Sequence, residues 1–270
     1  MNKNTPTILT IAGFDPYGGA GVQVDSKTIH ALGGYAFSVP TALTAQSSTG
    51  VKGLLSTELN IFKEQLSVLL DDVKVDALKL GMLADEEIVS VVVETIDRYE
   101  LKNIVLDTVL VSSSGRELLS AKAKELMVEE LFPRVELITP NLLEINSFLD
   151  ASFVGKRSEV EQIASAFFAL GVKNILIKGG HSLDENVATD YLVSNSFEVS
   201  SFSSPRVETS HTHGTGCLLS SAIATNLAKK ETLKNSVALA KEFLDERLKL
   251  SSSLKFNYVN KKLHRKEPLI

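Results

Sequence analysis

Short apolar runs alternate along this chain with longer amphipathic segments, and this alternation constrains the fold more than any other feature of the sequence. The runs that are typical of buried strands lie at residues 7–12, 77–80, 103–106, 135–139 and 174–178. The segments with apolar side chains at helical spacing lie at residues 59–70, 86–99, 121–131 and 159–170. Strand followed by helix, repeated in this way, predicts an α/β fold with a mostly parallel sheet that helices cover on both faces.

Two further runs favour a hairpin at one edge of this sheet. Residues 187–193 and 197–202 are both β-like and are separated by three polar residues, which is typical of an antiparallel hairpin. No proline- or glycine-rich linker and no internal repeat divides the 270 residues. We therefore expect a single domain over residues 1–270, with a core at about 7–250 and an irregular tail at 251–270.

The composition excludes several classes of protein. With 44% hydrophobic residues the chain is ordinarily globular, and its net charge of −5 lacks the basic field that nucleic acids and anionic membranes require. Basic residues gather at 261–266, where a solvated tail is the simple explanation. The chain has one cysteine, no apolar run of about 18 residues and no signal sequence, so we expect a cytoplasmic protein without intrachain disulfides or membrane spans.

A glycine-rich loop follows the first predicted strand. Residues 13–21 contain four glycines, and Asp25 comes early in the helix expected at 22–32. Glycines let a backbone approach a ligand closely or adopt positive φ. The loop has neither the spacing of a dinucleotide-binding fingerprint nor the lysine of a Walker A motif. It is therefore either a ligand-binding loop of another kind or a tight turn from strand to helix.

A second glycine loop opens the helix-forming run at 218–224. Its residues are His213, Gly214, Thr215, Gly216 and Cys217. The N-terminus of a helix has unpaired backbone N–H groups and partial positive charge, so this loop is suited to hold a phosphate or a phosphoryl group in transfer. A cysteine at a helix start is favoured as a thiolate and could accept a proton from a substrate hydroxyl. The alternative is that Cys217 is a small buried core residue.

Three charged residues follow predicted strands, where ligands bind in open α/β sheets. Asp107 and Glu144 are suited to hold Mg²⁺ mainly through water, although each could equally be a turn or helix-cap residue. Lys178 could contact a phosphate, or be a surface lysine. The five histidines and the lone cysteine lack the spacing of a structural zinc site, which we exclude.

The series of motifs resembles that of the hydroxymethylpyrimidine and phosphomethylpyrimidine kinases of the ribokinase-like superfamily. The matching stretches, in the same order as in that family, are LTIAGFDPYGGAGVQVDSKTIHALGGYAFSVPTALTAQSSTGV, LKLGML, VLDTVLV, LITPNLLE, LIKGGH and THGTGCLLSSAIATNLA. They extend over residues 7–248. The resemblance implies a three-layer αβα sandwich, and a homodimeric transferase of thiamine biosynthesis that uses ATP and Mg²⁺. It would phosphorylate 4-amino-5-hydroxymethyl-2-methylpyrimidine and then convert the monophosphate to the diphosphate.

The resemblance also implies roles for particular residues. Gln46 would hold the pyrimidine through its ring nitrogen and amino group, as a carboxamide with one donor and one acceptor can. The rest of the substrate pocket would be Gly13, Ala20, Asp25, Met82 and Val109. The anion hole would be Gly214, Thr215 and Gly216, with Cys217 as the catalytic residue. ATP phosphates would contact Lys178 and Asn141, and Mg²⁺ with its waters would be organised by Asp107 and Glu144.

The chain departs from the family pattern at a few positions. Phe14 and Tyr17 replace small hydroxyl residues in the first glycine loop, where they would narrow the pocket, cover it or pack. His211 replaces an asparagine, Leu218 replaces a threonine, and residues 251–270 lack the usual His-Gly-Pro ending.

Two other functions are compatible with the same motifs. One is a pyridoxal or pyridoxine kinase of the same fold, which Gln46 disfavours because the pyridoxal-using relatives do not keep glutamine there. The other is a catalytically silent relative that binds a pyrimidine, which the set of charged and glycine-loop residues disfavours. ATP turnover separates a silent binder from an enzyme.

Overall fold

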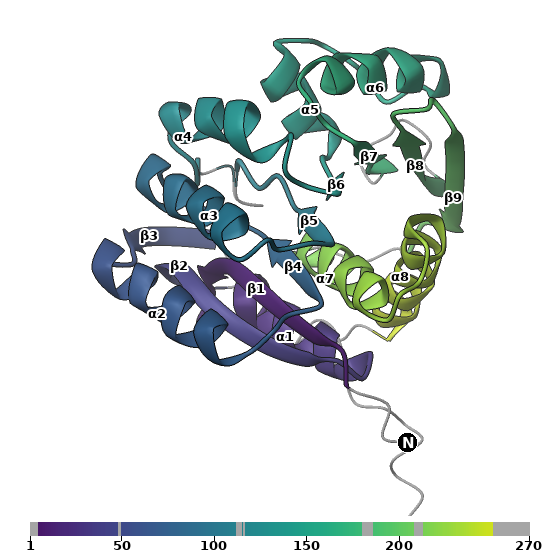
Figure 1. Ribbon diagram of the computed structural model, residues 1–270. Coiled ribbons are helices and arrows are strands. Elements are labelled where there is room, and N and C mark those ends of the chain that lie inside the picture. The colour runs from purple at the N-terminus through teal and green to yellow at the C-terminus, as the bar shows by residue number, and fades with distance from the viewer. Residues whose placement is uncertain are drawn as a thin grey trace, which may run out of the picture.

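Parallel strands form the middle of a mixed sheet, and antiparallel strands form both edges (Figure 1). The computed structural model describes residues 5–47, 50–111, 115, 117–179, 186–207 and 213–250. Within these residues the sheet has nine strands in the order β3-β2-β1-β4-β5-β6-β7-β8-β9. Their bounds are β1 Thr7–Phe14, β2 Tyr35–Ser47, β3 Gly50–Ser56, β4 Ala77–Leu80, β5 Ile104–Leu106, β6 Leu137–Ile138, β7 Asn174–Ile177, β8 Val187–Ser194 and β9 Val199–Pro205.

Helices cover both faces of the sheet, which confirms the expected three-layer αβα sandwich (Figure 1). One layer contains α2 (Leu59–Asp72), α3 (Glu86–Arg98), α4 (Ala121–Leu126), α5 (Leu142–Leu149) and α6 (Val160–Ala169). The other contains α1 (Gly21–Ala31), α7 (Thr215–Ala228) and α8 (Leu233–Lys249). A π-helical turn, η1 (Met127–Leu131), continues α4, and a short 3-10 helix, η2 (Arg157–Glu159), precedes α6. No helix among the described residues is long and apolar enough to cross a membrane.

The central strands are buried on both faces because successive side chains point to opposite layers. In β1, Leu9 and Ile11 pack in the α2–α6 layer, and Ile8 packs against the α1, α7 and α8 layer. In β4, Leu78 and Leu80 face the first layer and Ala77 faces the second. This double burial explains why these strands are continuous apolar runs in the sequence.

The five strands and the edge hairpin expected from the sequence are present, with shorter β6 and small shifts at other ends. The pair β2 and β3 at the opposite edge was missed. The first part of β2 is parallel to β1, and its last part is antiparallel to β3. Proline at position 40 and many small or polar residues hide this strand from a pattern search. Residues 251–270 and His211 lie outside the described residues, and the single-domain expectation stays a prediction.

Candidate active site

A cavity of about 740 Å³ opens at the carboxyl ends of the parallel strands, where α/β sheets bind ligands. All but one of the residues predicted from the sequence line its wall. They are Gly13, Ala20, Gln46, Met82, Asp107, Val109, Asn141, Glu144, Lys178, Gly214, Thr215, Gly216 and Cys217. Phe14 is also on the wall, whereas Tyr17 is 37% exposed and is not among the lining residues.

The two glycine loops, far apart in the sequence, pack against each other to form one side of the cavity. Gly214 precedes α7 with a φ of 85°, and a Cβ atom there would lie 1.9 Å from the carbonyl oxygen of Gly19. A Cβ atom at Gly21 would lie 2.0 Å from the carbonyl oxygen of Gly13. Both positions therefore require glycine for space as well as for backbone conformation. The first loop is a tight strand-to-helix turn that also forms part of the cavity wall, and its role in ligand binding stays a prediction.

The first turn of α7 carries Cys217 into the cavity wall. The side chain is half-buried, and its sulfur accepts a hydrogen bond from the Gly21 backbone N–H. Burial raises the pKa of the Cys217 thiol to about 11, against the opposing effect of the Lys79 ammonium. The thiol is therefore protonated near pH 7. Desolvation thus raises the pKa of this thiol more than the helix N-terminus and Lys79 lower it, and the role of Cys217 as a proton acceptor stays a prediction.

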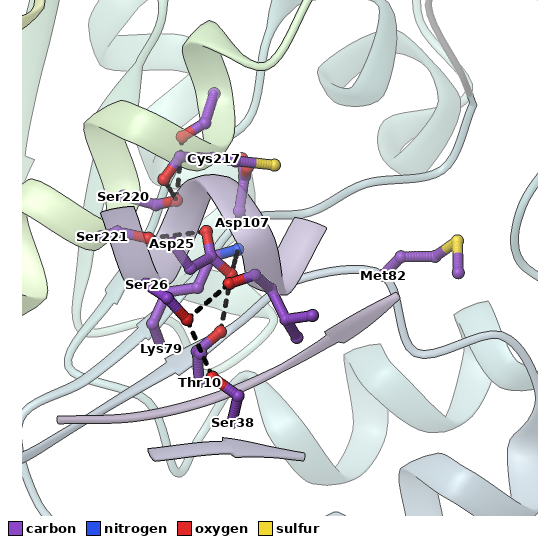
Figure 2. Close-up of polar contacts among 12 residues, drawn as sticks. Thr10, Asp25, Ser26, Ser38, Lys79, Met82, Asp107, Cys217, Ser220 and Ser221 are labelled. Atoms are coloured by element: carbon purple, nitrogen blue, oxygen red, sulfur yellow. Dashed lines mark hydrogen bonds and ion pairs between the residues drawn. The ribbon is translucent and has the colours of Figure 1, made fainter. Parts of the chain in front are cut away.

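Asp25 is the predicted site residue that does not line the cavity. It is fully buried beneath α7, where its carboxylate joins three other elements (Figure 2). Its Oδ2 accepts hydrogen bonds from Thr10 Oγ1 at 2.6 Å and Lys79 Nζ at 2.8 Å, and its Oδ1 accepts one from Ser221 Oγ at 2.7 Å. Ser221 lies one helical turn after Cys217, on the same face of α7. The carboxylate thus fixes α7 to α1, β1 and β4.

Lys79 supplies the positive charge that balances Asp25. Its side chain is fully buried on β4, and Asp25 is its one hydrogen-bond partner among the described residues. Burial lowers the pKa of Lys79, but the Asp25 carboxylate outweighs this effect and the pKa is raised. The ammonium therefore stays charged beneath the first turn of α7.

A second charged cluster lies at the ends of β5, β6 and β7, directly beside the second glycine loop, because a Cβ atom at Gly216 would lie 3.0 Å from Asp107 Oδ2 and 3.5 Å from Lys178 Nζ. Lys178 Nζ is 2.9 Å from Asp107 Oδ1 and 3.9 Å from Glu144 Oε2. Asp107 also accepts a hydrogen bond from Thr139. Burial raises the pKa of Asp107, but Lys178 and Lys79 outweigh it and the pKa is lowered. Asp107 is therefore an ionised carboxylate facing the cavity.

Glu144 is both a cavity residue and a helix cap. Asn141 Oδ1 accepts from the Glu144 backbone N–H at 3.0 Å, and Glu144 Oε2 accepts from the Asn141 backbone N–H at 2.8 Å. This is a capping box, and it confirms the cap alternative for Glu144. Thr108 Oγ1 also donates to Glu144 Oε2. Burial is the largest influence on the carboxyl of Glu144 and raises its pKa.

The turn that follows Lys178 is held by a buried ion pair that the sequence did not reveal. Asp190 on β8 accepts a hydrogen bond from the Gly179 backbone N–H at 2.8 Å, and its other oxygen is 2.8 Å from Lys241 Nζ on α8. A Cβ atom at Gly179 would lie 1.9 Å from the carbonyl oxygen of Thr189. The backbone at this end of β7 is therefore fixed by packing as well as by charge.

Gln46 on β2 projects into the cavity and contacts a residue to which the sequence assigned no role. Gln46 Nε2 is 2.8 Å from His213 Nε2. Thr44 Oγ1 donates to the Phe14 carbonyl oxygen at 2.9 Å and lies 3.2 Å from Gln46 Oε1. From the sequence, His213 was named as the first residue of the second glycine loop and was rejected as a zinc ligand, but its side chain was given no part in the site. Its place directly before Gly214, inside a quoted family motif, was the available signal.

These features define a class of protein, which the comparisons make specific. A glycine loop at a helix N-terminus beside charged residues at the strand ends is typical of small-molecule kinases, and the solved structures that this sandwich matches are ribokinase-like kinases. The sequence model of the family described as phosphomethylpyrimidine kinase matches residues 15–264. The chain belongs to the phosphomethylpyrimidine kinase family.

Individual relatives agree with this assignment. The chain is 41% identical over 250 residues to the hydroxymethylpyrimidine/phosphomethylpyrimidine kinase of Escherichia coli (strain K12), covering 93% of each chain. The crystal structure of phosphomethylpyrimidine kinase from Clostridium difficile 630 has a TM-score of 0.79 and 35% identity, covering 90% of this chain and 99% of that one. The ADP complex of Bacillus subtilis pyridoxal kinase has a TM-score of 0.84 and 30% identity, covering 93% and 94%.

Proposed function

We propose that this chain is an ATP-dependent kinase that phosphorylates 4-amino-5-hydroxymethyl-2-methylpyrimidine and then its monophosphate, in thiamine biosynthesis. The observation that carries this proposal is the shared cavity of Gln46 and the Gly214–Cys217 cradle. A carboxamide offers one donor and one acceptor edge, which complements the amino group and ring nitrogen of an aminopyrimidine. The cradle lies on the same wall as the first glycine loop, within reach of a hydroxymethyl group on such a ring.

The proposed reaction transfers the γ-phosphoryl group of ATP to the substrate hydroxyl oxygen, releasing ADP and one proton. Positioning and charge stabilisation supply most of the catalysis in such transfers. The backbone of Gly214, Thr215 and Gly216 at the α7 N-terminus would stabilise the charge on the moving group. Lys178, with Asn141 beside it on the wall, would bind phosphate oxygens of the nucleotide.

The residues present fit a magnesium ion held mainly through water. Among the described residues, no three histidine, cysteine, aspartate or glutamate side chains are grouped as a ready metal site. Mg²⁺ nevertheless needs only one or two carboxylates when phosphates and waters complete its shell. Asp107 and Glu144 both approach the Lys178 ammonium, so they face one region of the cavity. They would hold the ion, which would neutralise charge on the nucleotide phosphates.

Coupled ADP release with Mg-ATP tests the function. Hydroxymethylpyrimidine, its monophosphate and pyridoxal are offered separately. Turnover on both pyrimidines with pyridoxal weak is the expected result. Strong preference for pyridoxal would favour the second candidate, which the match to solved pyridoxal kinases supports. Binding of a pyrimidine without ATP turnover would instead establish a silent relative.

Replacing Gln46 with alanine should raise KM for the pyrimidine by roughly 5- to 150-fold, because an unpaired polar group in the complex costs about 1–3 kcal/mol. KM for ATP should change little. Steady-state kinetics with each substrate varied in turn measures both constants. An unchanged KM for the pyrimidine would remove Gln46 from the recognition site.

If the Cys217 thiolate accepts the hydroxyl proton, kcat/KM should rise with pH. Below the thiol pKa of about 11, the thiolate fraction grows about tenfold per pH unit. We expect this slope between pH 7.5 and 9.5 in the wild type and its loss in Cys217→Ser, which should also lower turnover far more than ATP binding. Full turnover by Cys217→Ser would show that the thiol only packs at the helix start.

We further propose a cytoplasmic homodimer, as the family resemblance implies. The outer face of the β2–β3 pair supports it. Leu43 and Leu55 lie opposite each other there and are 53% and 69% exposed. Exposed apolar pairs of this kind often mark contact surfaces. Sedimentation velocity of the wild type and of Leu43→Asp distinguishes a dimer through this face from a monomer.

A further inference from the structure

The ammonium group of Lys178 is shared by two carboxylates at the carboxyl end of the sheet. Its Nζ is 2.9 Å from Asp107 Oδ1 and 3.9 Å from Glu144 Oε2. Both carboxylate side chains are buried, so solvent and salt screen their charges little. When both are ionised, the single positive charge of Lys178 balances half of their charge.

A second lysine acts on Asp107 but is closed off from the cavity. Burial raises the pKa of Asp107, whereas Lys178 and, to a smaller extent, Lys79 lower it. The side chain of Lys79 is fully buried, and its ammonium donates to Asp25 at 2.8 Å. The side chain of Lys178 is 14% exposed and lines the cavity. A ligand that enters the cavity can therefore reach the ammonium of Lys178 but not that of Lys79.

Lys178 can turn from the carboxylates to the second glycine loop by moving its side chain alone. Its backbone N–H donates to the Pro140 carbonyl oxygen at 3.0 Å, so the backbone at this point is held. A Cβ atom at Gly216 would lie 3.5 Å from Lys178 Nζ, which places the ammonium beside the loop. Of its three N–H donors, one is used by Asp107 among the residues that the structure describes. A flexible stem and the remaining donors suit this ammonium to a phosphate at that loop.

We propose that Lys178 is the resident counter-ion of the Asp107–Glu144 pair and yields this place to Mg²⁺, so that its ammonium turns to the phosphate oxygens of the nucleotide. The inference rests on the proposed function in one respect, that these two carboxylates hold the metal. Two cations at the same carboxylates repel each other, and each lowers the affinity for the other. We therefore expect the protein alone to bind divalent ions weakly, and to bind them more tightly once Lys178 is replaced by a neutral residue.

The first test measures Mn²⁺ binding by electron paramagnetic resonance, at pH 8 and without nucleotide, in the wild type and in Lys178→Met. Methionine keeps most of the apolar stem and removes the charge. The Kd for Mn²⁺ should fall about tenfold or more in Lys178→Met. The gain should disappear when Asp107→Asn is added, because one carboxylate of the pair is then lost. An unchanged or higher Kd in Lys178→Met would overturn the inference.

Lys241→Met is the matched control for this change. Lys241 Nζ is 2.8 Å from Asp190 Oδ2, and both side chains are buried, as in the pair of Lys178 and Asp107. Removing this cation leaves a single carboxylate, whose other oxygen already accepts from the Gly179 backbone N–H. Lys241→Met should therefore keep the weak Mn²⁺ affinity of the wild type. An equal gain in both variants would overturn the inference, because any unpaired buried carboxylate would then explain it.

The second test uses stability, so it gives an answer even if Lys178→Met is only marginally folded. Urea unfolding at increasing Mg²⁺ concentration measures the free energy of unfolding of the wild type and of Lys178→Met. An ion that binds the folded state raises this free energy as its concentration increases. Mg²⁺ should stabilise Lys178→Met more than the wild type, because the two carboxylates then lack their own cation. Equal stabilisation of the two proteins would contradict the inference.

These outcomes separate the inference from the proposed function, because neither test involves turnover. If the wild type phosphorylates the pyrimidine but Lys178→Met gains no affinity for Mn²⁺, the proposed function stands and the counter-ion role of Lys178 fails. If Lys178→Met gains this affinity but the wild type phosphorylates no pyrimidine, the counter-ion role stands and the proposed function fails.

Discussion

Replacing Gly214 with alanine should lower kcat/KM by about a hundredfold or more. The new methyl group would lie 1.9 Å from the Gly19 carbonyl oxygen, so the two glycine loops must separate. The positive φ of Gly214 adds strain of about 1–2 kcal/mol for a residue with a side chain. The other residues of the proposed anion cradle come directly after Gly214 in the chain, so they should move with it. A displacement of about 1 Å in a phosphoryl-transfer site lowers the rate about 100-fold. Steady-state kinetics measures the loss.

Gly33→Ala is the matched control for this change. Gly33 has a similar φ of 80°, but nothing lies within 4 Å of a Cβ atom there. The control therefore carries the backbone strain without the clash, and it should lose some stability while keeping its activity. If both variants lose activity equally, backbone strain and not loop contact explains the effect. If neither does, the cradle does not depend on the contact between the loops.

The second large effect concerns the buried pair beneath α7. Lys79→Met leaves the Asp25 carboxylate buried without its cation, which should lower the free energy of unfolding by about 3–5 kcal/mol. The double variant with Asp25→Asn as well removes both charges and should recover much of this loss. Urea unfolding measures all three proteins under one set of conditions.

An exposed ion pair provides the comparison. Lys122 Nζ lies 3.9 Å from Glu86, and its side chain is 77% exposed. Lys122→Met should cost less than about 1 kcal/mol, because solvent screens such pairs. A Lys79→Met protein as stable as Lys122→Met would overturn the explanation by an unpaired buried charge. A double variant no more stable than Lys79→Met would assign the loss to packing rather than to charge.

Local sequence patterns predicted the layers of the fold because a strand that is buried on both faces consists of a continuous run of apolar residues. β1 and β4 are continuous apolar runs for this reason. β2 was missed because it changes partners along its length, parallel to one neighbour and antiparallel to the other. Such a change of partner produces no regular spacing of apolar residues that a sequence pattern could reveal. The residue of β2 that we propose binds the substrate, Gln46, was identified through the family resemblance and not through the pattern around it.

The predicted site residues also fall into two groups, those that a local motif indicated and those whose position depends on contacts distant in the sequence. Gly214 and Cys217 were found because a glycine loop before a helix has a known chemical use. Asp25 was expected on the cavity wall, and its place beneath it follows from Lys79 and Ser221, which are 54 and 196 positions away. The raised pKa of the Cys217 thiol was also not predicted. Burial decides the thiol pKa, and burial is a property of the assembled layers.

The carboxylate of Asp25 has a consequence for how the protein is made. Its partners lie far apart in the chain, since Thr10 is on β1 and Ser221 is on α7, 196 positions after Asp25. A nascent chain emerges from the ribosome N-terminal end first. Until α7 has been synthesised, Asp25 lacks one of its hydrogen bonds, and the first glycine loop lacks the surface against which it packs. The pair of packed glycine loops is therefore completed only late in synthesis, and we expect a chain interrupted before α7 to lack the side of the cavity that these loops form.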